Sequence, residues 1–263
     1  LIAEAATKPS RQAAVMAKIV DDDAYADADT VSVCYLDDAF GSALADALAG
    51  TLDAEVAASV SYPASAQNPA PPVDDALAPD PDAVAFVGSP GSSAAVLDEL
   101  LSREYEGALA LSSGLVPSNP QPNWTGVYTA SVASSKTVGT KRLQRQLSDV
   151  APLMVYTSNA YDAAALPLLA AEYAAEPSSP AAAGALQSVS GGAGHSVTVG
   201  EFDRARDLVD AGRDLNYQGA AGAVDLNDDL EPLTGYLVRQ VAESGMDTLE
   251  LLQRSYFAGG GDA

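Results

Sequence analysis

A regular alternation of short apolar runs with helical patterns constrains the first half of the chain more than any other feature. Runs of strand length, bounded by turn-forming residues, occupy residues 30–36, 55–62, 83–87 and 107–111. Apolar residues at helical spacing lie before and between these runs, near 11–20, 41–52, 73–77 and 92–103. Strands that alternate with helices in this way predict a doubly wound α/β unit built on a parallel sheet.

The second half of the chain follows a different pattern. Helical spacing occupies about 135–147, 159–175 and 202–211, and strand-like segments are confined to 126–130, 215–226, 236–241 and 249–257. Residues 177–194 are rich in Pro, Ser, Ala and Gly, so we expect an irregular stretch there and a surface loop at His195. This half has too few strands to build the sheet that its helices would cover.

The charge excludes several classes of partner. The chain has 36 acidic and 13 basic residues, a net charge of -23, and only four lysines. Phosphates repel such a surface, so we predict no nucleic-acid partner. An acidic surface of this kind stays soluble in concentrated salt, which favours a halophilic protein. Because Cys34 and His195 are the sole residues of their types, we predict no metal site and no cofactor.

Polar residues follow three of the predicted strands, at the points where helices begin. These junctions are Asp37–Gly41, Ser89–Ser92 and Ser112–Gly114. Ligands of open parallel sheets bind outside the carboxyl ends of the strands, and free N–H groups there suit polar ligands. Ser and Gly are also ordinary caps and turns, so both interpretations stay open. Catalytic and nucleotide-binding motifs are absent from the sequence, which predicts that the protein is not an enzyme.

Four of the 13 basic residues gather in one predicted helix, at Lys136, Lys141, Arg142 and Arg145. A solvated helix face and a docking patch are both compatible with this grouping.

Five segments share a further pattern. In chain order they are VSVCYLDDAFGSALADAL, SVSYPASAQN, DAVAFVGSPGSSAAVLDEL, SNAYDAAALPLLAAEYA and NYQGAAGAVDLNDD. Together they resemble the motifs of type I periplasmic solute-binding proteins, most closely the branched-chain amino acid receptors of ABC importers. The resemblance covers residues 7–257, which is nearly the whole chain.

The resemblance implies two α/β lobes joined by hinge strands, with a ligand bound between them. Residues 10–126 and 236–263 correspond to the second lobe, and residues 127–235 to the later part of the first lobe. Residues 1–9 correspond to a hinge or to the start of a fragment. The earlier part of the first lobe, with its parallel sheet, would precede Leu1, which would leave the second half here with few strands.

The ligand positions of the family's second lobe correspond to three places in this sequence. The aromatic residue after the first strand corresponds to Phe40. The position after the third strand corresponds to Ser89 or Pro90. The acid that receives an amino acid's ammonium group corresponds to Ser113 or its neighbour Ser112. The predicted ligand-binding set is therefore Phe40, Ser89, Pro90, Ser112, Ser113 and, from the later SNAYDAAALP segment, Asp162.

A serine carries no charge, so an ammonium group would need an acid from elsewhere, such as Asp37, Asp38 or Asp162. The expected ligand is a small polar molecule of amino acid, amide or carboxylate type. The resemblance implies a monomeric, extracellular protein, lipid-anchored through a segment outside this chain, that delivers the ligand to an ABC permease. One alternative is a sensing domain of the same fold, and another is an α/β enzyme that uses Asp37 or Asp38.

Overall fold

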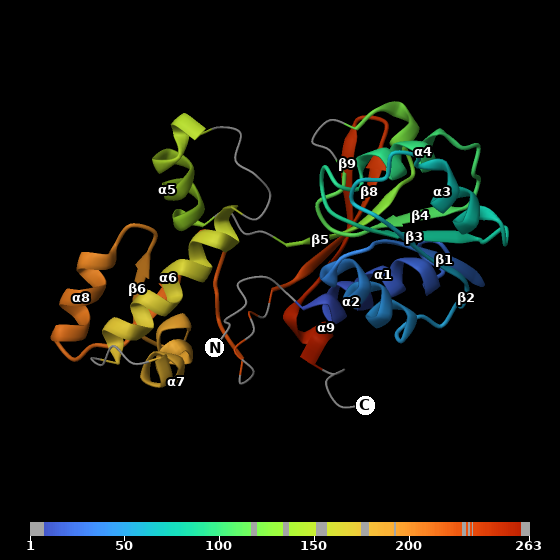
Figure 1. The fold of residues 1–263 in the computed structure, drawn as a ribbon. Helices are drawn as coiled ribbons and strands as arrows, with labels where there is room; N and C mark the ends of the chain where they lie inside the picture. The colour runs from blue at the N-terminus through green and yellow to red at the C-terminus, as the bar shows by residue number, and fades with distance from the viewer. Residues whose placement is uncertain are drawn as a thin grey trace. The chain divides into compact units, whose positions relative to one another are not determined.

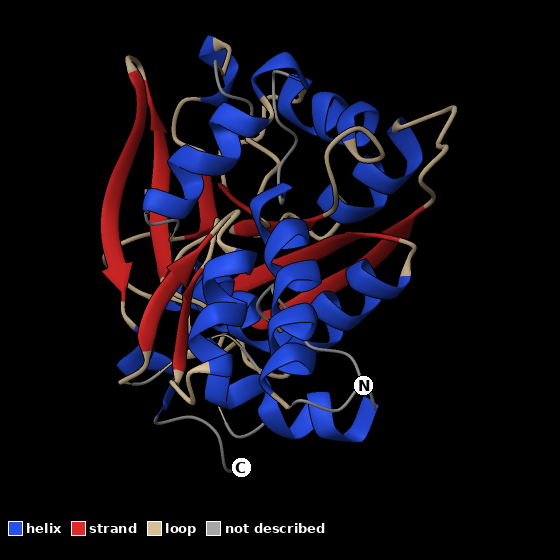
Figure 2. Ribbon diagram, turned by 90° about the vertical axis from the view of Figure 1, so that its left-hand side faces the viewer, coloured by secondary structure: helices blue, strands red, loops and turns tan. Residues whose placement is uncertain are grey.

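The structure is a computed structural model, and it describes residues 8–116, 120–133, 137–150, 157–174, 179–191, 193–227, 230, 232 and 234–258. The chain divides into two compact units (Figure 1). Unit 1 comprises Leu1–Lys8 and Ser134–Thr234, and unit 2 comprises Pro9–Ala133 and Gly235–Ala263. Both units combine helices with strands (Figure 2), so the predicted α/β class is confirmed.

Unit 2 is built on a seven-stranded sheet in the order β2-β1-β3-β4-β5-β8-β9. The strands are β1 (Thr30–Leu36), β2 (Glu55–Tyr62), β3 (Ala83–Val87), β4 (Ala108–Leu111), β5 (Tyr128–Val132), β8 (Tyr236–Ala242) and β9 (Gly245–Leu252). The first five strands in the order pair in parallel. All five residues of β3 are buried, as its continuous apolar run predicts for a central parallel strand.

Helices cover both faces of this sheet. They are α1 (Pro9–Asp21), α2 (Ala39–Ala49), α3 (Ala70–Leu77) and α4 (Ala94–Ser102), and a single turn of 3-10 helix covers Pro122–Trp124. α1 and α2 lie on one face and α3 and α4 on the other (Figure 1). Successive strand residues point to opposite faces, so Val31 and Val33 pack toward the first pair, whereas Cys34 and Leu36 pack toward the second.

The last strands of unit 2 correct two predictions. The predicted lobe boundary at residue 126 lies before β5, but β5 joins the sheet of unit 2, because it pairs with both β4 and β8. The strand predicted at 249–257 ends at Leu252 as part of β9, and α9 (Arg254–Ala258) follows it. β9 begins earlier because residues 243–244 turn the chain back onto β8, helped by Gly245 at φ 137°.

Unit 1 is mainly helical. Its helices are α5 (Val138–Gln146), α6 (Thr157–Tyr173), α7 (Ser179–Ser190) and α8 (Phe202–Asp210), with a 3-10 turn at Ser148–Val150. Among its described residues, the strands β6 (His195–Thr198) and β7 (Leu215–Gln218) form a parallel pair. A core that includes Leu166, Leu186 and Tyr217 joins α6, α7 and β7.

Two predictions for unit 1 are wrong. Part of the stretch expected to be irregular is the helix α7, because Pro180 stands in its first turn, where Pro is tolerated, and alanines favour the turns that follow. Leu186 and Val189 are buried in this helix, and their apolar contacts offset the entropy that the chain loses when it is ordered. His195 begins β6 instead of lying in a loop, because its segment pairs with β7, although its side chain is exposed.

Candidate ligand-binding edge of unit 2

The carboxyl ends of β1, β3 and β4 lie side by side at one edge of the sheet. Tyr35 pairs with Val87, and Phe86 pairs with Leu111, so the residues after these strands emerge next to one another. We call this place the β-carboxyl edge. It brings together the predicted site residues of unit 2, which are Asp37, Asp38, Phe40, Ser89, Pro90, Ser112 and Ser113. Open parallel sheets bind ligands at this edge.

Ser112 connects the ends of β3 and β4. Its hydroxyl accepts the N–H of Gly88 at 3.1 Å and lies 3.3 Å from the carbonyl oxygen of Gly88, to which it donates. The side chain is fully buried. Ser112 therefore holds the backbone of the edge in place, and the half-buried Ser113 is the better placed of the two to meet a ligand.

Two buried side chains that the sequence analysis did not identify support the loop after β3. The hydroxyl of Tyr62, at the end of β2, lies 2.9 Å from the carbonyl oxygen of Val87 and 2.8 Å from Ser93 Oγ. Ser93 Oγ also accepts the N–H of Ser89 at 3.0 Å. Burial raises the pKa of Tyr62, which keeps its hydroxyl protonated. The signal available in the sequence was the position of Tyr62, at the same edge as the other strand ends.

The helix α4 begins at the β-carboxyl edge without a side-chain cap. Ser93 is its N-cap residue but makes no side-chain hydrogen bond to the helix, because Tyr62 and Ser89 engage its hydroxyl. The first N–H groups of a helix lack partners within the helix. Such groups favour carboxylate and other polar oxygens, so the chemistry of this edge suits a polar ligand.

The first turn of α2 contributes an apolar ring to the same edge. The side chain of Phe40 is 39% exposed. Asp38 caps the helix, because its Oδ1 accepts the N–H of Gly41 at 2.6 Å. Asp38 therefore has a structural role that accounts for its presence. Asp37 is exposed to solvent beside it.

Asp162 lies in α6 of unit 1, so the structure does not place it at the β-carboxyl edge of unit 2. Its buried carboxylate accepts the hydroxyl of Tyr217 at 2.7 Å and the N–H groups of Ala220 and Ala221 at 2.7 and 2.8 Å. Burial raises the pKa of Asp162, and these three donors oppose the rise. Protein groups thus surround this carboxylate, and a ligand contact at Asp162 stays a prediction.

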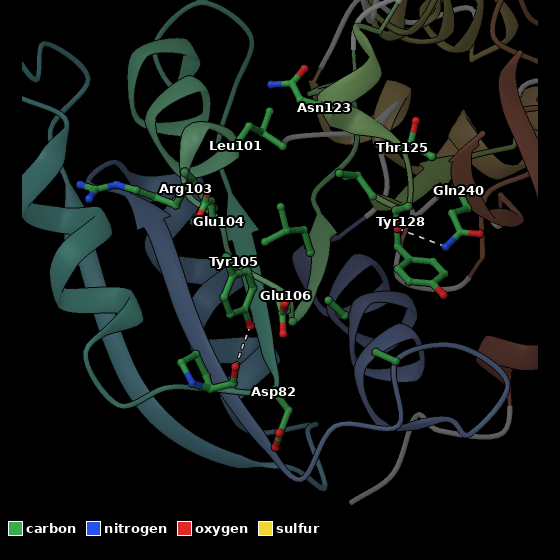
Figure 3. Close-up of a pocket in the computed structure, with 18 of the residues that line it drawn as sticks. Asp82, Leu101, Arg103, Glu104, Tyr105, Glu106, Asn123, Thr125, Tyr128 and Gln240 are labelled. Carbon is green, nitrogen blue, oxygen red and sulfur yellow. Dashed lines mark hydrogen bonds between the residues drawn. The ribbon is translucent and has the colours of Figure 1, made fainter. Parts of the chain in front are cut away.

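A hollow lies at the opposite edge of the same sheet, at the amino ends of β3, β4 and β5. It has a volume of about 970 Å³, and Asp82, Arg103, Tyr105, Tyr128 and Gln240 are among its lining residues (Figure 3). β4 and β5 pair only through Ala110 with Tyr128 and Leu111 with Thr129, so the amino end of β4 has no partner in β5 and the hollow opens beside it.

Several polar groups of this hollow are already bonded within the protein. The hydroxyl of Tyr105 donates to the carbonyl oxygen of Pro81 at 2.8 Å, and Gln240 Nε2 donates to that of Gly126 at 3.1 Å (Figure 3). Arg103 pairs with Asp74. At the β-carboxyl edge, by contrast, the first turn of α4 has no side-chain cap and the ring of Phe40 is exposed. We therefore place the candidate ligand site at the β-carboxyl edge.

Neither a reactive thiol nor a metal-binding cluster occurs in the part of the chain that the structure describes. Burial raises the pKa of the Cys34 thiol in β1 to about 12, so this group is neither exposed nor ionised at neutral pH. No cluster of three or more His, Cys, Asp or Glu among the described residues is arranged to hold a metal ion. None of the described helices has the length and apolar character needed to cross a membrane.

A curated protein closely resembles the chain in sequence. The chain is 62% identical over 262 residues to the chemotactic signal transduction system substrate-binding protein BasB of Halobacterium salinarum. The match covers 100% of this chain and 63% of that protein, so the chain spans less than two thirds of the relative's length. No protein-family model matches the chain.

Solved structures share the fold. A leucine-binding protein from Thermotoga maritima has a TM-score of 0.68 at 15% identity, over 93% of this chain and 66% of that one. An ABC transporter solute-binding protein from R. palustris, in complex with benzoate, has a TM-score of 0.68 at 11% identity, over 93% and 63%. The chain therefore has the fold of type I periplasmic binding proteins, as the five sequence segments predict. Membership of the branched-chain amino acid subgroup stays a prediction.

Proposed function

We propose that this chain belongs to an extracellular substrate-binding receptor, which binds a small polar molecule and signals its presence through a membrane partner. The observation that carries the proposal is the 62% identity to BasB along the whole chain. The type I periplasmic binding protein fold supports it, and so does a β-carboxyl edge that combines hydroxyls, an open helix terminus and the ring of Phe40.

Chemotactic signalling is the output that we favour. The name of BasB assigns that protein to a chemotactic signal transduction system. Delivery to an ABC permease, which the sequence resemblance implies, is the second candidate, and proteins that are 11% identical to the chain favour it. We rank signalling first because the chain is 62% identical to BasB but only 11% identical to the ABC transporter protein. Lipid anchoring and a monomeric state, which the resemblance also implies, belong to this proposal.

The ligand that fits the β-carboxyl edge carries a carboxylate, an amide or hydroxyls. Ser89 and Ser113 can donate to such groups or accept from them, and the amino end of α4 favours a carboxylate. Phe40 would pack against the apolar part of the ligand. An isolated ammonium group would have no acid at Ser112 or Ser113, and burying it unpaired is costly.

The test is calorimetry on the full-length receptor against leucine, valine, a sugar, benzoate and a short-chain amide in molar KCl. We expect one polar compound to bind, and Phe40→Ala and Ser113→Ala to weaken it, while Leu168→Ala, an exposed change in unit 1, leaves binding unaltered. In cells, loss of the gene should abolish attraction to that compound without lowering its uptake. Loss of uptake with normal attraction would favour the ABC importer instead.

A further inference from the structure

The helix α5 concentrates positive charge on a strongly acidic protein. Its nine residues, VGTKRLQRQ, include Lys141, Arg142 and Arg145 and no acid, whereas the chain has 36 acids against 13 bases. Lys136, the fourth basic residue of the predicted group, lies outside the described residues. In Figure 1, α5 stands at the end of unit 1 that is remote from α7.

One face of α5 is fixed to unit 1. Arg142 Nη1 pairs with Glu201 Oε1 at 2.7 Å and also donates to the carbonyl oxygen of Val199 at 3.3 Å. Leu143 is buried in a small apolar cluster. The backbone at Gly139 lies so close to Gly219 that a Cβ atom there would overlap its carbonyl oxygen. These contacts set which side chains of α5 face outward.

The other face of α5 forms a groove of about 480 Å³. Its lining residues are Val138, Lys141, Gln144, Arg145 and Ser148. Lys141 and Arg145 are exposed and one helical turn apart, and no carboxylate of the described residues forms an ion pair with either. Val138, at the same groove, is 63% exposed. The bases of α5 thus divide between an internal ion pair and an open groove.

We propose that this groove docks an acidic segment of a protein partner. Such a segment would present two carboxylates about one helical turn apart, roughly 5–6 Å, to match Lys141 and Arg145. An apolar side chain of the segment would cover Val138. The proposal is independent of the ligand at the β-carboxyl edge, so either can fail without the other.

Charge favours this occupant over two others. An anionic membrane surface would repel the rest of a protein of net charge -23. A second copy of this chain brings the same net charge, and one basic helix cannot offset the repulsion between two such molecules. A narrow acidic segment would contact Lys141 and Arg145 but little of the acidic surface around them, so it would be repelled less.

The docking contact should survive concentrated salt. At 1 M salt, charges are screened beyond about 3 Å, so steering at a distance is lost, but paired groups in direct contact are less affected. The hydrophobic contribution from burying Val138 against the partner does not weaken as salt concentration rises. The groove therefore combines a charged contact that selects the partner with an apolar contact that tolerates a saline medium.

The experiment uses the full-length protein and two synthetic helical peptides. One peptide carries glutamates at i and i+4 and a leucine one turn before them, and the other has glutamines in place of the glutamates. We expect binding of the glutamate peptide by fluorescence anisotropy in molar KCl, and about tenfold weaker binding of the glutamine peptide. Lys141→Glu and Arg145→Glu should each abolish binding. Arg213→Glu, which changes the charge equally at an exposed arginine elsewhere in unit 1, should not.

Three results would overturn the proposal. Equal binding of both peptides would exclude recognition of carboxylates. Binding to vesicles that contain phosphatidylglycerol, lost in Lys141→Glu, would assign the groove to a membrane surface. A change of oligomeric state in Lys141→Glu by analytical ultracentrifugation would assign it to a second copy. Circular dichroism of each variant shows that the fold is intact, which is expected because both side chains are exposed.

Discussion

Asp162 of α6 holds the backbone N–H of Ala220, 58 residues later in the chain, 2.7 Å from its Oδ1. The carbonyl oxygen of Ala220 accepts the hydroxyl of Thr140 in α5 at 2.6 Å. Both backbone groups of Ala220 are therefore tied, one to each helix. The carboxylate of Asp162 and the hydroxyl of Thr140 thus hold α6 and α5 to the loop after β7.

Asp162→Asn should lower the free energy of unfolding by about 1–3 kcal/mol, the range for leaving a buried polar group unsatisfied. The new amide NH₂ would face a backbone N–H group that now donates to the carboxylate. Denaturant titration of the full-length protein measures the loss. Asp207→Asn, at an exposed position of α8, is the matched control and should be close to neutral.

The pH dependence of the same variant has a definite sign. Burial raises the pKa of Asp162, so the native state binds this proton more tightly than the unfolded state does. The stability that comes from this residue is then fully present below the unfolded pKa, and it is lost as pH rises through the raised value. The gap in stability between the natural protein and Asp162→Asn should narrow from acid to neutral pH. A gap that widens would show a lowered pKa.

The central strands of unit 2 could be predicted because their signals are local. The run Ala83–Val87 is apolar at every position, and all of it is buried. The helix α7 could not be predicted, because its Ala-rich and Ser-rich sequence has a weak periodicity, and Leu186 and Val189 become a buried face only when α6 is present.

The hydrogen bonds that hold the loop after β3 could not be predicted from the sequence for a different reason. Tyr62 and Ser93 meet although they are 31 residues apart, and they lie in two different segments of the five quoted above, so neither segment alone predicts the contact. The chain order placed Ser89 and Ser112 at the same edge, since parallel strands end together. It did not show that Ser112 is buried and bonded to Gly88, whereas Ser113 is partly open.

Gly88→Ala tests this support. A Cβ atom at Gly88 would lie 2.5 Å from the Tyr62 hydroxyl oxygen and closer still to Ser93 Oγ, so the hydroxyl pair would have to separate. We expect lower thermal stability and weaker ligand binding together. Gly50→Ala is the control, because the nearest atom to its Cβ would be 3.6 Å away. If Gly88→Ala left both properties unchanged, the pair would have no role in holding the loop.

The fold should require salt. With a net charge of -23, surface acids repel one another, and this repulsion acts over about 10 Å at 0.1 M salt but about 3 Å at 1 M. The thermal unfolding midpoint should therefore rise steeply as KCl increases from dilute buffer to molar concentration. A midpoint that stays level over this range would contradict the predicted halophilic character.

The last prediction concerns the charge that the ligand carries at the β-carboxyl edge. Because Ser113 stands where an acid would receive an ammonium group, leucine should bind more weakly than isocaproate, which has the same carbon skeleton without the amine. Ser113→Asp should reverse this order, since a carboxylate would pair with the ammonium group and repel the free acid. Phe40→Ala should weaken both ligands, because it removes the apolar wall. Calorimetry on the full-length protein measures all three effects. Micromolar leucine binding that is indifferent to Ser113→Ala but lost in Phe40→Ala would place the acid elsewhere, with Asp37, the exposed neighbour of the helix cap Asp38, as the candidate at this edge.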